Sequence, residues 1–495
     1  MTQALSSELQ VIAEQCTGRG ARGVVAAAAP LAAQAGADVL RSGGNAYDAV
    51  VTMALAEGVL LPPKCGLGGD LVALRLLPDA ESPEALLAVG GAPAGLAAVA
   101  TAAPGTDDGG WRDVGPTSVG PPAAAAGYLA LAELGLLPLE RLAAPAIALA
   151  EQGFPWATVA ADLSRQAAPL VAEMHPGPDG CIYLPGGHPI EAGTIVRLPR
   201  LATAIGELVS RRDGFLDGPV GEAIVRAVAE RGGVLTRDDL LTHARADWVT
   251  CAEGMAGPYR AWTTPGPTHG PALLIAAAGA TGDTDAGHTY QRVMGAVATA
   301  RDELSDPGGT SMVSAADADG NVVVVVHSNS YPRFGSGIVV PEYDLVLNNR
   351  AGRGFTPEAG HPNFPVAGRR PATTLHIWMV ADDTGRPRLA GGTPGGDNQM
   401  PWNSQLLDQV VGGCWSPGLL VTSPRWEWVP SDDSVRVESG LANDDIAALA
   451  AVAPRVVRRP RWGLKSAQQV VRVRRDDEPF EAAADPRTVG LALGV

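Results

Sequence analysis

The chain has 495 residues, which is long enough to bury a large core without a disulfide or a structural metal. It contains 37 basic and 53 acidic residues, a formal net charge of −16, which argues against a nucleic acid or an anionic membrane as partner because both attract basic surfaces. Charged residues make up 18% of the chain and hydrophobic residues 46%, which excludes wholesale disorder.

Cysteine usage and the chain start indicate a reducing compartment. The five cysteines are scattered and form no CxxC pair, which argues against a disulfide framework or a zinc site. Residues 1–15 lack the basic and then apolar regions of a secretory signal. No window of about 18 residues is apolar enough to span a membrane. We therefore expect a cytoplasmic protein with reduced thiols.

The first half of the chain predicts helices separated by Gly- and Pro-containing turns. Apolar residues recur at helical spacing over 29–42 and over 46–60, the second with Asn45 as its N-cap. A Gly-rich turn at 65–70 leads into a strand-like segment at 71–77. The remaining predictions for this half are helices at 124–135, 139–152, 219–232 and 283–305, and loops within 156–200.

Strands become frequent after residue 308. Asp319-Gly320-Asn321 followed by five valines predicts a hairpin that enters a fully buried strand. The further predictions are strands at 337–348, 373–381 and 388–390, a helix at 402–412, and an α/β segment at 431–475. Helices early, strands late and a buried valine run together indicate a layered α/β architecture.

Several common functional motifs are absent. The Gly-rich segment at 66–71 lacks the third glycine of GxGxxG, and the sequence has no GxxxxGK[ST], no GxSxG and no HExxH, which argues against a phosphate-binding loop, an α/β-hydrolase nucleophile and a zincin site. The eight histidines are dispersed, so we expect no histidine-rich metal site and no cofactor.

A colinear series of motifs carries a family resemblance. Residues 43–49 read Gly-Gly-Asn-Ala-Tyr-Asp-Ala, and residues 62–69 read Pro-Pro-Lys-Cys-Gly-Leu-Gly-Gly. Ala150-Glu-Gln-Gly-Phe-Pro155 and Gly232-Gly-Val-Leu-Thr-Arg-Asp-Asp239 follow in order. Over about residues 21–475 the chain resembles the γ-glutamyltransferase (γ-glutamyltranspeptidase) family.

The resemblance implies an α/β fold of four layers, αββα, the N-terminal-nucleophile (Ntn) hydrolase fold. It implies one chain that cuts itself into a large segment, residues 1–309, and a small segment, residues 310–495. The two segments are expected to remain together as one globular unit, so the partner of each fragment is the other fragment.

Thr310 is the predicted nucleophile. It opens the run Thr310-Ser-Met-Val-Ser-Ala-Ala-Asp-Ala-Asp-Gly-Asn321, where the family has its autoprocessing Thr. A Thr hydroxyl is a weak nucleophile that needs a base, and cleavage of the Gly309–Thr310 bond would supply one in the new α-amine. Gly308-Gly309 gives the backbone the freedom that a strained turn requires.

The resemblance places further site residues by their position relative to Thr310. A second hydroxyl that hydrogen-bonds the nucleophile falls on Ser328, 18 residues on. The substrate-contacting Asn of the family falls on Asn329, with Ser330 as the competing position. The Gly-Gly backbone pair that forms the oxyanion hole falls on Gly395-Gly396. Thr373-Thr374 stand where the family has a Ser pair that binds a substrate carboxylate.

The substrate-reading residues depart from the family pattern. Where relatives that take γ-glutamyl groups have an Arg in Arg-Glu-x-Ala-Pro, this chain has Val89-Gly-Gly-Ala-Pro93. The Asp that holds the α-ammonium falls on Arg353, within Leu347-Asn-Asn-Arg350-Ala-Gly-Arg353. Because an Arg pairs with a carboxylate and not with an ammonium, γ-glutamyl is an unexpected acyl group, and Arg350 and Arg353 favour an anionic small-molecule substrate. A solvated loop or an internal salt bridge is the other interpretation of these two arginines.

Three functions are compatible with this pattern. The first is an Ntn hydrolase or acyltransferase that works through an acyl-Thr intermediate without γ-glutamyl donors, with antibiotic (secondary metabolite) biosynthesis as one compatible setting. The second is a C–C bond hydrolase that trims a side chain from an alkyl-proline-type antibiotic precursor. The third is an inactive relative that binds a metabolite.

Overall fold

Two seven-stranded antiparallel sheets form the centre of the molecule in the computed structural model, which describes residues 7–102, 110–282, 284–301, 310–330, 333–475 and 478–495. Sheet A has the order β1 (Thr17–Gly20), β22 (Phe480–Ala484), β21 (Gln469–Arg472), β17 (Pro387–Gly392), β16 (Ile377–Ala381), β11 (Tyr259–Thr263), β10 (Ala252–Ala256). Sheet B has the order β23 (Leu491–Gly494), β2 (Gly23–Ala27), β12 (Ser311–Asp317), β13 (Val322–Ser328), β3 (Asp70–Leu76), β4 (Glu84–Ala88), β9 (Asp247–Thr250). Each sheet contains strands from before and after residue 310.

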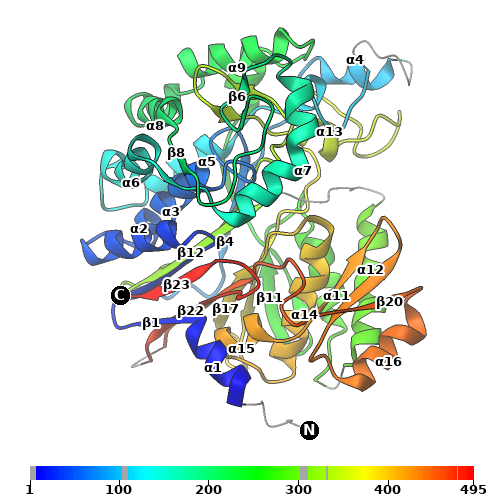
Figure 1. The fold of residues 1–495 in the computed structure, drawn as a ribbon. Helices are drawn as coiled ribbons and strands as arrows, with labels where there is room; N and C mark the ends of the chain where they lie inside the picture. The colour runs from blue at the N-terminus through cyan, green and yellow to red at the C-terminus, as the bar shows by residue number, and fades with distance from the viewer. Residues whose placement is uncertain (1–6, 103–109, 283, 302–309, 331–332, 476–477) are drawn as a thin grey trace.

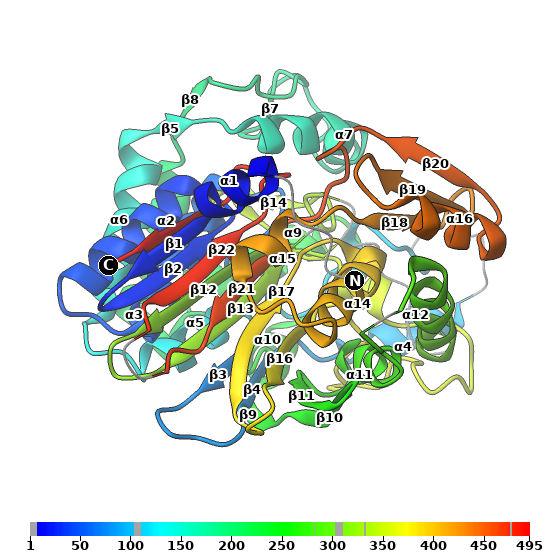
Figure 2. The ribbon, with the colours of Figure 1, turned by 90° about the horizontal axis from the view of Figure 1, so that it is seen from below.

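Helices cover the outer face of each sheet, so the fold is the four-layer αββα arrangement (Figures 1 and 2). The helices on the side of sheet B are α2 (Pro30–Arg41), α3 (Ala46–Leu60), α5 (Ala124–Ala132), α6 (Leu139–Gln152), α7 (Thr158–Met174), α8 (Pro199–Arg211), α9 (Pro219–Ala229) and α10 (Arg237–His243). Those on the side of sheet A are α11 (Gly270–Ala278), α12 (Ala286–Arg301), α14 (Gln399–Val411), α15 (Pro417–Thr422) and α16 (Asn443–Val452). A third apolar cluster lies between the sheets.

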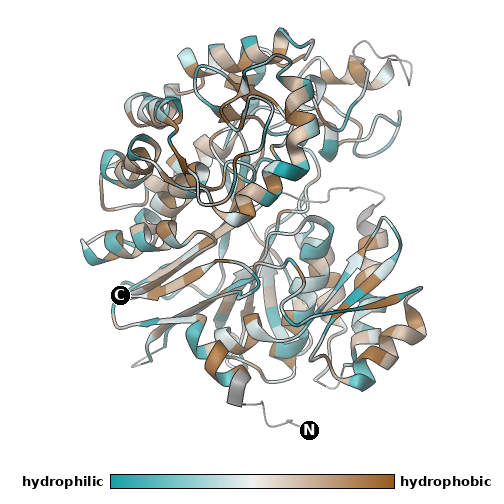
Figure 3. Ribbon diagram, viewed as in Figure 1, coloured by the Kyte–Doolittle hydropathy of each residue, from teal (hydrophilic) through white to brown (hydrophobic). Residues whose placement is uncertain are grey.

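Shorter elements complete the chain. The helices are α1 (Ser7–Gln15), α4 (Leu96–Thr101) and α13 (Arg350–Gly354), with 3-10 turns η1 (Pro116–Ser118), η2 (Arg212–Gly214) and η3 (Gly396–Asn398). The small sheets pair β5 (Phe154–Pro155) with β8 (Ile195–Val196), β6 (Gly180–Cys181) with β7 (Leu184–Pro185), β14 (Val339–Val340) with β15 (Leu345–Val346), and β18 (Trp426–Val429) with β19 (Ser434–Glu438) and β20 (Val456–Arg459). In Figure 3, helices on the outside of the molecule, such as α2 and α16, contain hydrophilic residues, which are coloured teal.

The alternation of side chains along β12 and β13 decides which layer each residue faces. Met312 and Val324 belong to the cluster between the sheets, whereas Val313 and Val325 belong to the cluster under the helices of sheet B. All five valines of β13 are at most 2% exposed, and burying each contributes on the order of 1.5 kcal/mol. By the same period of two, Ser328 faces the space between the sheets.

Most of the predicted elements are present, and two regions differ from prediction. Helix α3 begins and ends where the sequence placed it, and Asn45 forms a capping box with Asp48. The expected loops at 156–200 instead include the 17-residue helix α7, which accommodates Pro169 in its interior. The strand predicted at 337–348 is reduced to the two-residue strands β14 and β15. Within the described residues, no helix is long and apolar enough to cross a membrane.

Candidate active site

The predicted site residues gather at one end of the two sheets. Residues 318–320, the tip of the β12–β13 hairpin, line a small cleft with Val473 and Arg474, which follow β21. Because β21 and β17 are antiparallel with Arg472 opposite Leu389, the hairpin tip lies at the end where β17 begins. At the other end of the sheets, away from the hairpin tip, lie the start of β12, the end of β13, the start of β3, the start of β16 and the end of β17.

Thr310 and Ser328 are in direct contact at this end. The Thr310 hydroxyl donates a hydrogen bond of 3.2 Å to Ser328 Oγ, and the two side chains are each 1% exposed. The backbone N–H of Ser330 donates to the same Ser328 Oγ at 2.8 Å, with Ser330 at φ 70°. Ser328 is therefore held in place on its other side. Gly309, the other predicted partner in self-cleavage, lies outside the described residues.

Asn329 is fixed by the segment before the Gly-rich turn. Its backbone N–H donates to the Lys64 carbonyl at 2.8 Å, and its Nδ2 donates to the Pro62 carbonyl at 3.0 Å. Its Oδ1 is buried and has no hydrogen-bond partner among the described residues. A Cβ on Gly69 would lie 2.4 Å from the Ser328 carbonyl oxygen, so only Gly fits there. The turn thus packs its backbone directly behind Ser328 and leaves one amide oxygen of Asn329 to accept a hydrogen bond.

Arg350 is part of an internal ion pair. Its Nε donates to Asp70 Oδ2 at 2.8 Å, with the Arg side chain 1% and the Asp side chain 0% exposed. Asp70 Oδ1 also accepts from the Gly90 backbone N–H at 3.2 Å. Asp70 stands opposite Ser328 in the β3–β13 register, so the ion pair borders the nucleophile strand.

Arg353 lies nearer the surface than Arg350. Its Nη1 donates to Asp113 Oδ2 at 2.8 Å, and the side chains are 14% and 56% exposed. An ion pair with such an exposed carboxylate is weak, because water screens it. The Arg353 guanidinium can therefore exchange Asp113 for another carboxylate at low cost, whereas Arg350 cannot leave the buried Asp70.

Gly395 and Gly396 form the turn that leads from β17 into η3 and α14. Both have positive φ, 149° and 57°, and a Cβ on Gly395 would lie 2.3 Å from the Trp402 ring. The turn ends at the start of consecutive helical segments, where backbone N–H groups point outward and favour negative charge. This is the geometry that an oxyanion hole uses.

Gln399 joins the Gly-Gly turn to the predicted Thr pair. With its amide oxygen toward the turn, Gln399 Oε1 accepts from the Gly396 N–H at 3.2 Å, and its Nε2 donates to the Thr374 carbonyl at 3.1 Å. Thr373 and Thr374 are both fully buried, and the Thr373 hydroxyl accepts from the Leu375 N–H at 3.2 Å. The structure therefore brings the two sequence-predicted pairs together through a residue that the motif search did not reveal.

Two buried histidines beside the Thr pair were also not predicted from the sequence. The His269 backbone N–H donates to the Thr373 carbonyl at 3.0 Å, while both ring nitrogens lack a partner among the described residues. His376 Nδ1 donates to the Thr374 carbonyl at 2.8 Å, and its Nε2 accepts from Asn403 Nδ2 at 2.8 Å. Burial lowers the pKa of His269 to about 3 and that of His376 to about 4. Both imidazoles are therefore neutral near pH 7. In the sequence only His376 lies near Thr373-Thr374, whereas His269 is distant and reaches the pair through the fold.

Comparison with known proteins identifies relatives of the chain. A family model described as Gamma-glutamyltranspeptidase matches residues 32–287 and 283–495. The chain is 27% identical to the oxamate amidohydrolase proenzyme of Klebsiella pneumoniae over 95% of its own length and 98% of that protein. It is 25% identical to the glutathione hydrolase proenzyme of Escherichia coli over 95% and 91% of the two chains.

A solved structure shares the fold across nearly the whole chain. The crystal structure of cephalosporin acylase from Bacillus halodurans superposes with a TM-score of 0.85 at 26% sequence identity, and the match covers 97% of both chains. The likeness therefore extends to both helix layers and both sheets.

Proposed function

This chain belongs to the γ-glutamyltranspeptidase family and is an enzyme of the Ntn-hydrolase type, and we propose that Thr310 is its nucleophile and that its substrate is a small molecule with an anionic acyl group. The observation that carries the proposal is the 3.2 Å hydrogen bond between the Thr310 and Ser328 hydroxyls, at the end of the sheets where the Gly395-Gly396 turn also lies. Relatives that the comparisons name are proenzymes, which fits a chain that matures by cleavage.

Self-cleavage begins with attack of Thr310 Oγ on the carbonyl carbon of Gly309. The C–N bond of that peptide breaks, the amine of Thr310 takes up a proton, and an ester forms between Gly309 and Thr310 Oγ. Water then hydrolyses the ester and leaves fragments of 309 and 186 residues (495 − 309). The fragments remain together because sheets A and B each contain strands of both.

The released α-amine of Thr310 is the base for the second reaction, since its ordinary pKa is about 7.7–8.0. It removes the hydroxyl proton as Oγ attacks the substrate carbonyl, while Ser328 holds the Oγ in position. Backbone N–H groups of the Gly395-Gly396 turn stabilise the oxyanion, with the Gly396 N–H exchanging Gln399 Oε1 for it, and one donor contributes about 3–4 kcal/mol in comparable holes. The leaving group departs with the proton, and water or an amine removes the acyl group from Thr310.

An acyl group with a negative charge and no amine fits the residues that surround the site. Val89, at the position of the glutamyl-reading Arg, is 1% exposed and belongs to the core between the sheets. Arg353, at the position of the ammonium-binding Asp of the family, carries the opposite charge and pairs with the exposed Asp113 carboxylate. The relative named oxamate amidohydrolase supports the same class, because oxamate is a small anion without an amine.

A denaturing gel of the purified protein tests the nucleophile. We expect two bands, of 309 and 186 residues, for the wild type and one intact band for Thr310→Ala. Thr310→Ser should still cut, and Thr384→Ala, in an exposed turn, is the control for loss of a Thr hydroxyl elsewhere. Cleavage of Thr310→Ala at the same bond would refute the assignment, and a wild type that stays intact and inactive would make the chain a metabolite-binding relative.

Mass spectrometry of the mature protein with a panel of amides tests the substrate class. Oxamate and short dicarboxylate monoamides are expected to leave an acyl adduct on Thr310, and γ-glutamyl-p-nitroanilide is expected to react poorly. Arg353→Ala should raise KM for the anionic amides at least tenfold with little change in kcat. Efficient turnover of the γ-glutamyl donor would overturn the assignment of Arg353, and an adduct formed with loss of a carbon leaving group would identify C–C cleavage of an alkyl-proline-type antibiotic precursor.

A further inference from the structure

Three side chains with metal-binding atoms converge behind the nucleophile strand. Glu57 comes from α3, Cys65 from the Gly-rich turn and His327 from β13, and their donor atoms all lie within 4.8 Å of one another. All three are at most 1% exposed. Among the residues that the structure describes, no other group of three such side chains meets this criterion. Since His327 faces the helices and Ser328 faces the opposite side of β13, the cluster and the candidate active site lie on two sides of one strand.

The neighbouring groups already orient these donors. Glu57 Oε1 accepts from the backbone N–H groups of Ala28 and Ala29, at 2.7 and 3.1 Å, which turns Oε2 toward His327 Nε2 at 3.0 Å. The other ring nitrogen, His327 Nδ1, is 2.8 Å from the Tyr128 hydroxyl. A partner on the second ring nitrogen is typical of metal-bound histidines, because it fixes the ring and its tautomer.

We propose that Glu57, Cys65 and His327 form a binding site for Zn²⁺ or a divalent cation of similar softness. Thiolate, imidazole and carboxylate are the donors that zinc takes in proteins, and one thiolate plus one carboxylate neutralise a 2+ charge in a buried place. Zinc would replace the thiol proton of Cys65, which leaves to solvent. The imidazole proton would move to Nδ1 and be donated to the Tyr128 oxygen, so His327 remains neutral.

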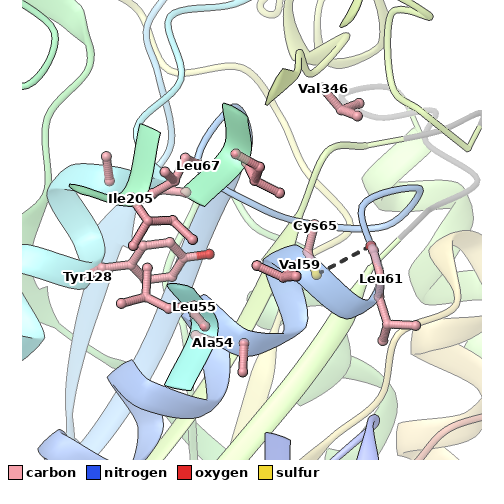
Figure 4. Close-up of a cluster of buried hydrophobic side chains, with 14 of the residues drawn as sticks. Ala54, Leu55, Val59, Leu61, Cys65, Leu67, Tyr128, Ile205 and Val346 are labelled. Atoms are coloured by element: carbon pink, nitrogen blue, oxygen red, sulfur yellow. Dashed lines mark hydrogen bonds between the residues drawn. The ribbon is translucent and has the colours of Figure 1, made fainter. Parts of the chain in front are cut away.

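A fourth donor is available beside the three ligands. Figure 4 shows Cys65 and Tyr128 among apolar side chains, with the Cys65 thiol directed at the Leu61 carbonyl 3.8 Å away. The Ser311 hydroxyl is fully buried and lies close enough to the Cys65 thiol to hydrogen-bond it.

Ser311 stands directly opposite His327 in the β12–β13 pair, so its hydroxyl belongs to the same side of sheet B as the cluster. It can therefore complete a four-coordinate site. Ser311 follows Thr310 and His327 precedes Ser328 in the chain. Metal binding would therefore restrict the backbone next to the Thr310 and Ser328 hydroxyls of the candidate active site. The proposal does not depend on Thr310 being the nucleophile, since its evidence is the donor geometry on the other side of the strand.

Titration of the metal-free wild type with Co²⁺ tests the site. We expect one equivalent to bind with a thiolate-to-Co²⁺ charge-transfer band in the near ultraviolet, and one equivalent of Zn²⁺ to abolish it. X-ray absorption of the zinc form should show one sulfur at about 2.3 Å and lighter donors at about 2.0–2.1 Å. Cys65→Ala should lose the band, and Cys251→Ala, which removes another buried thiol, should keep it.

His327→Gln supplies a second variant, because an amide can still hydrogen-bond Tyr128 and Glu57. It should fold, as judged by near-ultraviolet circular dichroism, and bind Co²⁺ at least tenfold more weakly. A wild type that binds no Co²⁺, or a zinc shell with only oxygen and nitrogen, would overturn the proposal and leave the cluster as a hydrogen-bonded Tyr128–His327–Glu57 chain. A charge-transfer band that persists in Cys65→Ala would also overturn it.

Discussion

The hydroxyl of Ser328 links the candidate nucleophile to the rest of sheet B. It accepts from Thr310 Oγ at 3.2 Å and from the Ser330 N–H at 2.8 Å. Such a hydroxyl orients the Thr310 oxygen lone pairs toward a carbonyl carbon and carries no charge of its own. Its effect is therefore expected on the rates of reaction and not on the fold.

Ser328→Ala should slow both self-cleavage and turnover by about 10²-fold. This is the lower end of the range of rate effects for groups that assist proton transfer. Ser328→Thr, which restores a hydroxyl, should recover most of both rates. The measurements are the half-time of the 495-residue band and kcat of the mature enzyme. Unchanged rates in Ser328→Ala would show that the hydrogen bond to Thr310 has no part in the reaction.

The two arginine pairs predict different stability costs. Asp70→Ala leaves Arg350 charged and buried, so we expect it to lower the free energy of unfolding by about 3–5 kcal/mol. Asp113→Ala removes an exposed partner of Arg353 and should cost less than about 1 kcal/mol. Denaturant unfolding of the uncleaved Thr310→Ala chain measures both. Equal losses would mean that Arg350 is not committed to Asp70.

Sequence patterns could place residues within one segment but not their distant partners. The offset from Thr310 to Ser328 is local to one hairpin, and the structure brings the two hydroxyls together. Asp70 lies 280 positions from Arg350, and no charge pattern in the sequence joins them. The choice between a substrate-facing and an internally paired arginine therefore required the tertiary structure.

Elements with strong local signals were predictable. Helix α3 has a cap, a continuous apolar run and a clear end, and the β12–β13 hairpin has a turn sequence followed by valines. Helix α7 was not predicted, because the segment 156–200, with its Pro and Gly residues, was interpreted as containing loops, whereas the helix accommodates Pro169 in its interior. Strand length at 337–348 was overestimated, because β-propensity does not reveal how far a partner strand extends.

The turn between β17 and α14 makes a prediction at this scale. Gly395→Ala should reduce kcat at least 10²-fold, because the added Cβ meets the Trp402 ring at 2.3 Å and φ is 149°, so the Gly395-Gly396 N–H groups must move. Gly385→Ala has a positive φ of 78° but open space around the Cβ, and it should leave kcat unchanged. Steady-state kinetics on an anionic amide compares them. Similar kcat values for both variants would exclude this turn as an oxyanion hole.

Two buried histidines, His269 and His376, and the half-buried His175 affect the stability of the whole molecule. Burial lowers the pKa of His175 to about 4, of His269 to about 3 and of His376 to about 4, from an ordinary value of 6.5. Below pH 6.5 the unfolded chain binds these protons and the folded chain does not. Stability is therefore full above pH 6.5 and falls as the pH drops toward 4, by about 1.4 kcal/mol per pH unit for each histidine.

His269→Phe should reduce that slope by about one proton between pH 6 and pH 4. His269 is the suitable position because its ring makes no hydrogen bond within the described residues, so its removal breaks none. Unfolding free energies of the uncleaved Thr310→Ala chain, with and without the second substitution, give the two slopes. Identical slopes would mean that His269 titrates normally in the folded state.

The order of strands in sheet B has a consequence for the timing of maturation. The strand that follows Thr310, β12, lies between β2 and β13, and its inner face meets Gln469, whose Nε2 donates to the Met312 carbonyl at 2.6 Å. The last strand, β23, then closes the edge beside β2. During synthesis on the ribosome these late residues emerge last, so a complete site cannot exist on a nascent chain. If Thr310 cuts the chain as proposed, we expect cleavage only in molecules that contain these late strands, and a product truncated before β21 should remain intact.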